Sequence, residues 1–552
     1  MRRFDVIVVG GGGAGVAAAV AARRAGARVA LLSKEPAGYG DTRIAEGAIT
    51  YPGRSADDSP EVFLRDVMSA GEQLCDLDLV TTLARDAERG VHDLEDFGFL
   101  IRRDADGFIS DQVANRSGGH SIARTVSGSG RGVHIGVSLR AACAREGVSV
   151  IEDCMAVRLL TADERVVGVQ TYDLVMGEWQ ALHARTVILA TGGTGWLYYP
   201  HTDCVRSTTG DGFALALEAG AELVEMEQVQ FLPFGLTHPD SMMGIFCAEP
   251  GHAGPYGRLL DGEGSVVLEG LRNLNRAQVT RVMAQVMKEG RVGPHGGLFL
   301  DLRPNLEHPD GVAARKTIVK GGGFKGVRAA YGQQAYSWKE PLEVLPTAHY
   351  HMGGVRVDVD GRTNTPGLFA AGAVQGGVHG GNRLGSVALT EIFVFGRRAG
   401  EAAAREALGP CHGANNESTP QSPSIFPGRT GRFRPIQLVR RLQKVMWEHA
   451  GPLRDENGIG AGLRELDLLE EDYADISIGP AKRCNPEMRD ALELQLMLLT
   501  ARAILASALE RRESRGAHLR ADFPDRGPQP YRTVTRLDDQ RRLNVTQDRI
   551  RA

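Results

Sequence analysis

Three glycines near the amino terminus have the spacing of a turn that binds a dinucleotide. Gly10, Gly12 and Gly15 follow the apolar run FDVIVV and precede an alanine-rich stretch, with Gly13 and Ala14 between them. In such a turn the first glycine permits the tight bend, the second lets the backbone approach a pyrophosphate, and the third allows a helix to pack closely on a strand. The first N–H groups of the helix then face the phosphates. The position between a strand and a helix favours a dinucleotide site over a turn without a ligand.

The end of the next apolar run bears on which dinucleotide is bound. Ser33, Lys34 and Glu35 stand where NAD enzymes of this fold usually carry an acid for the ribose hydroxyls. Ser33 or Glu35 must serve here, which weakens the case for NAD. Two later segments, Thr191-Gly192-Gly193 with Ala190 before it and the run that ends at Gly372, favour FAD, because flavoproteins with two dinucleotide motifs close the nucleotide fold with such segments.

The elements that must position these residues alternate between strand and helix. Apolar runs at 4–9, 28–34, 186–193 and 367–373 predict buried strands, and 14–27 and 213–222 predict helices. Glycines and prolines break the pattern between 237 and 342, which predicts an inserted domain. The predicted units are an FAD-binding domain at 1–236 and 343–408, a capping or substrate domain at 237–342, a linker at 409–431, and a C-terminal helical domain with a polar, extended tail at 432–552.

The composition excludes several classes of protein. A chain of 552 residues suggests two to four domains of about 100–200 residues each. The net charge of −4 argues against nucleic acid as a partner. No run of about 18 apolar residues occurs, so no membrane-spanning helix is expected. The seven cysteines are scattered without a CxxC pair, which fits reduced thiols in a cytoplasmic protein and excludes an iron–sulfur cluster bound by this chain alone. No metal site is predicted.

Four further segments carry a family resemblance that extends over nearly the whole chain. They are TGDG at 209–212, PTAHYHMGGV from 346, GAVQGGVHGGNRLGSVALTEIFVFGRRAG from 372, and ESRGAHLRADFP at 513–524. Together they resemble the flavoprotein subunits of the succinate dehydrogenase and fumarate reductase family, with L-aspartate oxidase as a close relative. The resemblance implies an α/β fold, in which a Rossmann-like FAD-binding domain carries an inserted α+β capping domain and is followed by a C-terminal helical domain.

The resemblance also implies roles for individual residues. His349 matches the histidine that binds one substrate carboxylate, and Arg383 matches the arginine that clamps it, a task that suits the planar guanidinium. Arg276 matches the arginine that transfers a proton, and Glu249 matches a relay glutamate. His252 could replace the relay arginine of the family, or it could be a loop histidine without a role.

The expected FAD contacts are spread along the chain. In addition to the residues of the two motifs, the resemblance implies contacts from Asp41, Thr42, Gly47, Ala156, Asp211, Ala373, Arg383, Ser386, Ala388 and Leu389. Two of these positions depart from the family. Asp41 replaces the histidine that bonds covalently to FAD in respiratory members, which predicts non-covalent FAD. Ala373 replaces a glutamate that contacts FAD, which removes one hydrogen bond of many.

Departures on the substrate side argue against a C4-dicarboxylate. Leu232, Phe234 and Ala248 stand where the family has the histidine and threonines that bind the second carboxylate, and Ala277 replaces an acid. Apolar side chains cannot hydrogen-bond a carboxylate, and a buried carboxylate without partners costs several kcal/mol. A substrate with one carboxylate therefore fits better than succinate or fumarate.

We therefore expect hydride transfer between flavin N5 and a C–C bond next to a carboxylate. Two alternatives remain open. The first is an amino acid oxidase like L-aspartate oxidase that uses O2. The second is a flavoprotein subunit that passes electrons to an iron–sulfur or ferredoxin-like partner.

Overall fold

The amino-terminal part of the chain forms the nucleotide-binding sheet. In the computed structural model, which describes residues 3–110, 113–320, 323–324, 326–410 and 425–550, its strands have the order β5-β2-β1-β8-β7-β6, and β16 also pairs with β8. Their bounds are β1 Arg3–Val9, β2 Val29–Leu32, β5 Ser149–Ile151, β6 Cys154–Ala162, β7 Arg165–Asp173, β8 Glu178–Leu189 and β16 Leu368–Ala370. β1 pairs in parallel with β2 and β8, whereas β6, β7 and β8 pair antiparallel. The expected strands at 4–9, 28–34, 186–193 and 367–373 all belong to this sheet.

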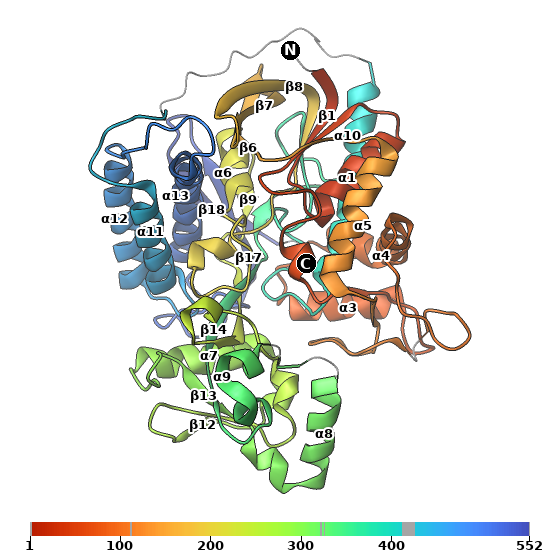
Figure 1. The fold of residues 1–552 in the computed structure, drawn as a ribbon, viewed down its shortest axis with the longest axis vertical. Helices are drawn as coiled ribbons and strands as arrows, with labels where there is room; N and C mark the ends of the chain where they lie inside the picture. The colour runs from red at the N-terminus through yellow and green to blue at the C-terminus, as the bar shows by residue number, and fades with distance from the viewer. Residues whose placement is uncertain (1–2, 111–112, 321–322, 325, 411–424, 551–552) are drawn as a thin grey trace.

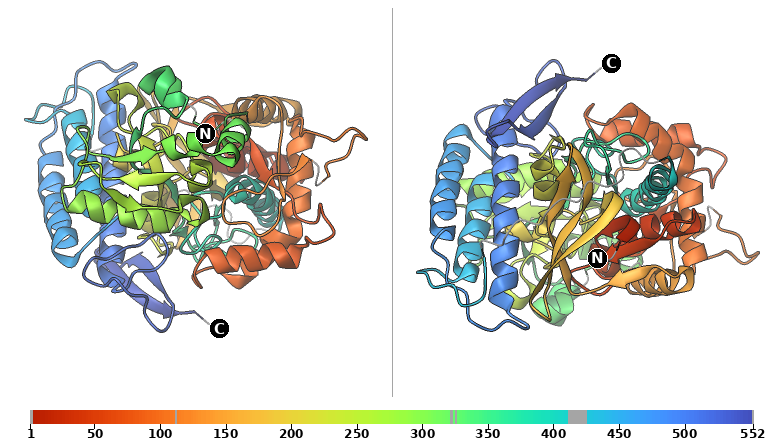
Figure 2. Two further views of the ribbon diagram at one scale, coloured as in Figure 1. Left: turned by 90° about the horizontal axis from the view of Figure 1, so that it is seen from below. Right: turned by 90° about the horizontal axis from the view of Figure 1, so that it is seen from above.

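Both faces of this sheet are covered, which explains why β1 is apolar at every position from Val6 to Val9. Val6 and Val8 pack into one core and Ile7 and Val9 into another. The helices that contribute to the first core are α1 Gly13–Arg24, α3 Pro60–Ala70, α4 Leu77–Phe97, α5 Arg131–Glu146 and α10 Val387–Leu408. The second core includes α6 Asp211–Glu218 and the C-terminal helices. Figure 2 shows these two groups of helices on opposite sides of the strands.

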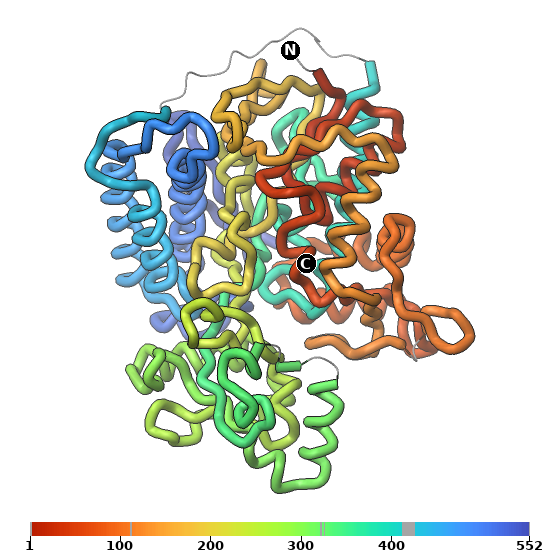
Figure 3. Tube along the Cα trace, in the orientation of Figure 1, coloured from red at the N-terminus to blue at the C-terminus, as the bar shows by residue number. Residues whose placement is uncertain are grey.

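The inserted segment builds a second, antiparallel sheet around a core of its own. Its strand order is β10-β14-β13-β11-β12, with bounds β10 Val229–Leu236, β11 Arg258–Leu260, β12 Val266–Leu268, β13 Leu298–Asp301 and β14 Leu342–His351. The helices are α7 Arg276–Lys288, α8 Pro309–Lys320 and α9 Val327–Tyr336. The predicted insertion at 237–342 lies between β10 and β14, and because these two strands pair, the sheet reaches beyond both ends of that range. This unit is the green lobe at the bottom of Figure 1 and Figure 3.

The C-terminal part consists of three long helices and a hairpin. The helices are α11 Pro435–Ala450, α12 Glu456–Tyr473 and α13 Pro486–Glu510. Among the described residues, α13 is the one helix long and apolar enough to cross a membrane, and 72% of its most apolar window is buried inside the protein. Most of the predicted linker, residues 411–424, lies outside the described residues.

The polar tail is extended, as expected, but it is also paired into a sheet. β17 Tyr531–Leu537 and β18 Leu543–Arg549 form an antiparallel hairpin. β17 also pairs with β9 Leu223–Val224, and β9 pairs with β15 Gly354–Val355. Thr533, Val534 and Thr535 are buried there, so the tail covers part of the nucleotide-binding half instead of extending into solvent.

Candidate active site

The start of α1 forms the first part of a cradle for an anion. The helix begins at Gly12 without a side-chain cap, and its first turn carries no acid. A Cβ on Gly12 would meet nothing nearer than the Tyr39 carbonyl oxygen at 3.9 Å, whereas one on Gly15 would overlap the Gly10 carbonyl oxygen. The buried hydroxyl of Thr191 has no hydrogen-bond partner among the described residues. Free N–H groups, open space at Gly12 and an unpartnered hydroxyl fit a bound pyrophosphate.

The start of α10 contributes a second helix terminus of the same kind. Ser386 is its N-cap at φ 64°, and its hydroxyl lies 3.1 Å from that of Ser117. Ala388 and Leu389 are in the first turn, where backbone N–H groups have no partner within the helix. Gly372 has φ 77°, and a Cβ there would lie 2.6 Å from the Cβ of Ala14, so the turn after β16 approaches α1 closely. These residues fit the FAD implied by the sequence.

Several other expected FAD residues lie around this cradle. The Thr42 hydroxyl accepts a hydrogen bond of 3.3 Å from the Gly13 N–H, and Asp41 starts the short helix α2 Asp41–Ile44. The backbone of Ser33 bonds to Cys154 at the start of β6, two residues before Ala156. Gly47 has φ 70° and contacts the backbone of Arg131. Ala190 follows directly after β8, and Ala373 follows Gly372 in the turn after β16.

Lys34 and Asp211 lie together, but their charged groups bind each other. The Lys34 ammonium is 2.7 Å from Asp211 Oδ2 and 2.9 Å from Glu493 Oε1. Burial would raise the pKa of Glu493, but the cations Lys34, Arg489 and Arg206 lower it to about 2. The side-chain charges of Lys34 and Asp211 therefore belong to an ion-pair cluster that joins the nucleotide-binding sheet to α13.

On the substrate side, two arginines meet at one amide. Arg276 donates from Nε to Glu249 Oε2 at 2.9 Å, and a second bond joins the same guanidinium to the other carboxylate oxygen. The Gln230 oxygen accepts from Arg276 at 3.2 Å and from Arg383 Nε at 3.3 Å. The Gln230 amide in turn donates to Asn382 Oδ1 at 2.9 Å. Gln230 thereby holds the Arg276 guanidinium next to that of Arg383.

Burial and neighbouring charge change the titration of these groups. Burial first, and the nearby Arg276 second, lower the pKa of Arg383 to about 10. Burial would raise the pKa of Glu249, but the Arg276 guanidinium holds it below its usual value. Burial raises the pKa of Asp41 to about 7, against the hydrogen bond from the Val205 N–H and with a further increase from Asp203. Arg276 and Glu249 are thus a charged pair, and Arg383 is an unusually acidic guanidinium.

His349 lies on β14 and is held by a carboxylate that the sequence did not reveal. Its Nδ1 is 3.0 Å from Asp203 Oδ1 and 2.9 Å from Oδ2. The Phe246 ring lies 6.5 Å from the imidazole, centroid to centroid. The next residue, Tyr350, has its ring centroid 4.9 Å from the guanidinium carbon of Arg383. His349 is among the groups that lower the pKa of Glu249, and Asp203 is among those that act on Arg383, so the His349–Asp203 pair lies in the same region as the two arginines.

The other residues singled out in the sequence either support Glu249 or are buried and apolar. His252 caps the turn that begins at Glu249, with its Nδ1 3.2 Å from the Glu249 N–H, so it supports the relay residue. Phe234 and Ala248 are buried in the core of the capping unit, away from solvent. Leu232 is buried on β10, two residues after Gln230.

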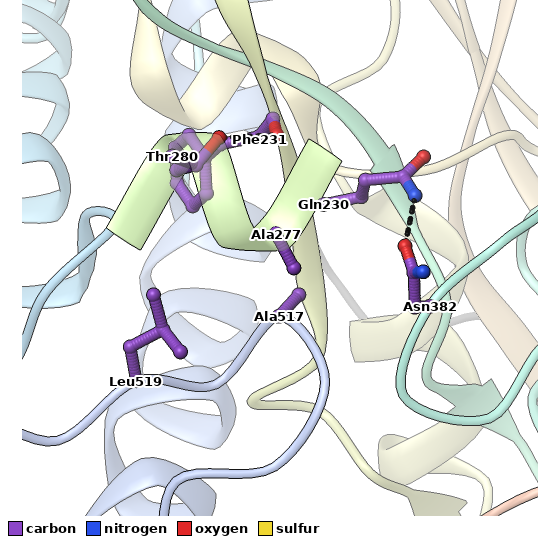
Figure 4. Close-up of a pocket in the computed structure, with 7 residues that line it drawn as sticks. All are labelled: Gln230, Phe231, Ala277, Thr280, Asn382, Ala517 and Leu519. Carbon is purple, nitrogen blue, oxygen red and sulfur yellow. Dashed lines mark hydrogen bonds between the residues drawn. The ribbon is translucent and has the colours of Figure 1, made fainter. Parts of the chain in front are cut away.

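A small pocket lies behind Gln230, where α7, β10 and the C-terminal segment meet. Its lining residues are Gln230, Phe231, Ala277, Thr280, Asn382, Ala517 and Leu519 (Figure 4). The figure shows Ala277 facing Ala517, while Gln230 turns to Asn382. Ala277, which stands where the family has an acid, therefore adds apolar surface to this pocket behind Gln230.

Sequence reasoning missed three site residues: Asp203, Gln230 and Tyr350. Asp203 and His349 are 146 residues apart, and no spacing in the sequence connects them. Gln230 stands two positions before Leu232 and Tyr350 directly after His349, so proximity to residues of interest was the one signal available for them.

Comparisons with known proteins show the family to which the chain belongs and support FAD as its cofactor. A family model for an FAD binding domain matches residues 5–389, and one for the fumarate reductase flavoprotein C-term matches residues 439–551. A component of the fumarate reductase (CoM/CoB) of Methanothermobacter marburgensis is 35% identical over 513 residues, which is 90% of each chain. L-aspartate oxidase of Streptomyces coelicolor is 33% identical over 98% of this chain and 93% of the relative. The structure of Mycobacterium smegmatis Sdh1 in complex with UQ1 superposes with a TM-score of 0.87 and 30% identity, over 100% of this chain and 95% of that chain.

Proposed function

The chain belongs to the flavoprotein family of fumarate reductase and succinate dehydrogenase, with FAD as its cofactor, and from that premise we propose that it moves two hydrogens across a C–C bond next to a carboxylate. Its substrate in this proposal is an organic acid other than succinate or fumarate. The observation that supports the proposal is the meeting of Arg276 and Arg383 at the Gln230 oxygen, near enough to His349 for it to act on the pKa of Glu249.

The residues of the chain divide the chemistry between them. Arg383 binds the substrate carboxylate, and its charge stabilises the negative charge that develops on the substrate in the transition state. His349 lies beside this position, with its Nδ1 bonded to Asp203. FAD held between the starts of α1 and α10 would supply the hydride chemistry, with its two electrons, at one carbon of the substrate. Arg276 gives a proton to the neighbouring carbon during reduction and removes it during oxidation. Glu249 accepts two bonds from Arg276, so it is placed to pass that proton to and from the guanidinium.

Replacement of Arg276 tests this assignment. Arg276→Ala should lower turnover by about 10²–10⁴-fold, the usual contribution of a general acid–base residue, while the purified protein stays yellow. The assay is reoxidation of the reduced enzyme by an unsaturated carboxylate. The matched control is Arg281→Ala on the same helix, an exposed arginine that donates to the Pro524 carbonyl oxygen. Undiminished turnover of Arg276→Ala would refute the assigned role.

A second candidate function is amino acid oxidation with O2, favoured by the similarity to L-aspartate oxidase. The core that buries Phe234 and Ala248 counts against it, because these two side chains offer no donors for a second carboxylate. Hydrogen peroxide released in step with an amino acid substrate would decide for it. Strict dependence on another electron acceptor would decide against it.

We also propose that electrons pass to an iron–sulfur or ferredoxin-like partner. The relative of Methanothermobacter marburgensis is by its name one component of a larger enzyme. A copurified iron–sulfur protein that reduces or oxidises the bound flavin would support this assignment.

A further inference from the structure

The basic side chains of the candidate site do not all have a carboxylate partner. Arg276 is paired with Glu249, and His349 with Asp203. Arg383 donates to the neutral Gln230 oxygen and lies over the Tyr350 ring. Within the described parts of the chain, no carboxylate lies within ion-pair distance of Arg383. The Arg276 charge is thus neutralised by the protein and the His349 Nδ1 is bonded to a carboxylate, whereas the Arg383 charge is left for the substrate.

Asp203 is fixed next to His349 by a short backbone strap, residues 201–205. The Thr202 hydroxyl donates to the Ala348 carbonyl at 2.8 Å, and the Ala348 N–H donates to the His201 carbonyl at 2.9 Å. The Cys204 thiol donates to the His349 carbonyl at 3.1 Å. Because the strap bonds on both sides of Asp203, the carboxylate keeps both oxygens within 3.0 Å of the imidazole.

Other features on this side of the site also disfavour a second anion. The strap bonds through the Val205 N–H to Asp41 at 2.9 Å, so a second acidic side chain adjoins Asp203. Phe246 faces His349, and Leu232 is buried two residues along β10 from Gln230. A substrate carboxylate placed here would lose water to a surface of acidic and apolar side chains, which disfavours its burial.

We propose that Asp203 is a specificity-determining residue, whose carboxylate next to His349 leaves this side of the site without a net positive charge, so that the site accepts a monocarboxylate and rejects a dicarboxylate. This inference rests on the proposed function. The substrate class is a short 2-enoate, or its saturated counterpart, with one carboxylate at Arg383 and an apolar far end. At a separation of about 6 Å and an effective dielectric constant of about 20, the negative charge of Asp203 repels a second substrate carboxylate. This repulsion is large enough to lower the affinity for a dicarboxylate by about tenfold to hundredfold.

Crotonate and fumarate make a matched pair of probes, because a methyl group in one replaces a carboxylate in the other. Each is titrated into the FAD-loaded protein, and binding is followed by the change in flavin absorbance. Wild type should bind crotonate more than tenfold more tightly than fumarate. In Asp203→Asn the ratio should shift towards fumarate by about tenfold or more. Asp203→Glu should keep the preference for crotonate, and Asp467→Asn, a change on exposed α12, should leave both affinities as they were.

The outcomes separate this inference from the proposal beneath it. A wild type that binds fumarate as well as crotonate overturns the role of Asp203, whether or not the variant folds. Equal weakening of both ligands in Asp203→Asn means that the residue only supports the structure, and it also overturns the inference. A wild type whose flavin responds to neither acid contradicts the proposed function itself.

Discussion

Glu391 lies on α10, next to the cradle formed by α1 and the turn after β16, and is 1% exposed. Burial raises the pKa of its carboxyl group to about 8, against an opposite effect from the Gly372 N–H. An unfolded glutamate titrates near pH 4.3, so the folded protein keeps a proton that the unfolded chain releases. Glu391 is therefore neutral at neutral pH, unlike Glu249, whose negative charge Arg276 stabilises.

This difference in protonation gives a pH prediction. Because the folded state binds the additional proton, the contribution of Glu391 to stability is fully present below about pH 4 and is lost as the pH rises towards 8. Glu391→Gln is neutral at every pH, so its free energy of unfolding should depend less on pH between 5 and 8 than that of wild type. Urea unfolding of both FAD-loaded proteins at several pH values measures the slopes. Parallel slopes would show that Glu391 is ionised in the folded protein.

At the scale of elements, the packing of α1 on α10 places both helix starts at the cofactor cradle. Gly396 approaches the backbone of Ala14, and Gly400 approaches that of Ala18. A Cβ on Gly400 would overlap the Ala18 carbonyl oxygen. The glycines thus let two long helices run in close contact, and this contact fixes the distance between their N-termini.

Gly400→Ala should consequently destabilise the protein by about 1–3 kcal/mol through overpacking and weaken FAD binding. Gly460→Ala on α12 is the control, because its added Cβ would meet only the end of Arg464, at 3.5 Å. There the better helix propensity of alanine should stabilise by about 0.5–1 kcal/mol. Thermal unfolding compares the two changes, and equal effects would show that the contact between α1 and α10 is not tight.

At the scale of the molecule, the Lys34 cluster joins parts that are distant in sequence. Lys34 follows β2, Asp211 begins α6, and Glu493 lies on α13, 459 residues from Lys34. Arg206 and Arg489 also bind Glu493, at 3.2 and 3.1 Å. The cluster therefore ties the helical domain to the strand that ends at the cradle.

Lys34→Met should destabilise the whole protein by about 3–5 kcal/mol, because it leaves the buried Asp211 carboxylate without its counter-ion and weakens the charge balance around Glu493. Lys288→Met removes an exposed pair with Asp455, whose side chains are 46% and 31% exposed, and is the control. It should cost no more than about 1 kcal/mol. Urea unfolding provides the comparison, and similar losses in both variants would contradict a structural role for the buried cluster.

The sequence by itself determined the cofactor class and the α/β architecture. The G-x-G-x-x-G turn, its strand and its helix lie within one continuous stretch, and the positive φ of Gly10 and the approach of Gly15 to the Gly10 carbonyl oxygen are local reasons for glycine there. Apolar runs likewise predict strands, because a sheet covered on both faces needs apolar residues at every position.

Only the tertiary structure decided how the charges of the site are compensated. Asp203 meets His349 across 146 positions, and Gln230 meets Arg383 across 153. Lys34 was expected at the cofactor, yet its charge binds Asp211 and Glu493. A charged side chain can satisfy itself with any suitable partner that folding brings near, so residue type and spacing leave the partner open. The energy of each pair depends on distance and burial, which exist only in the folded chain.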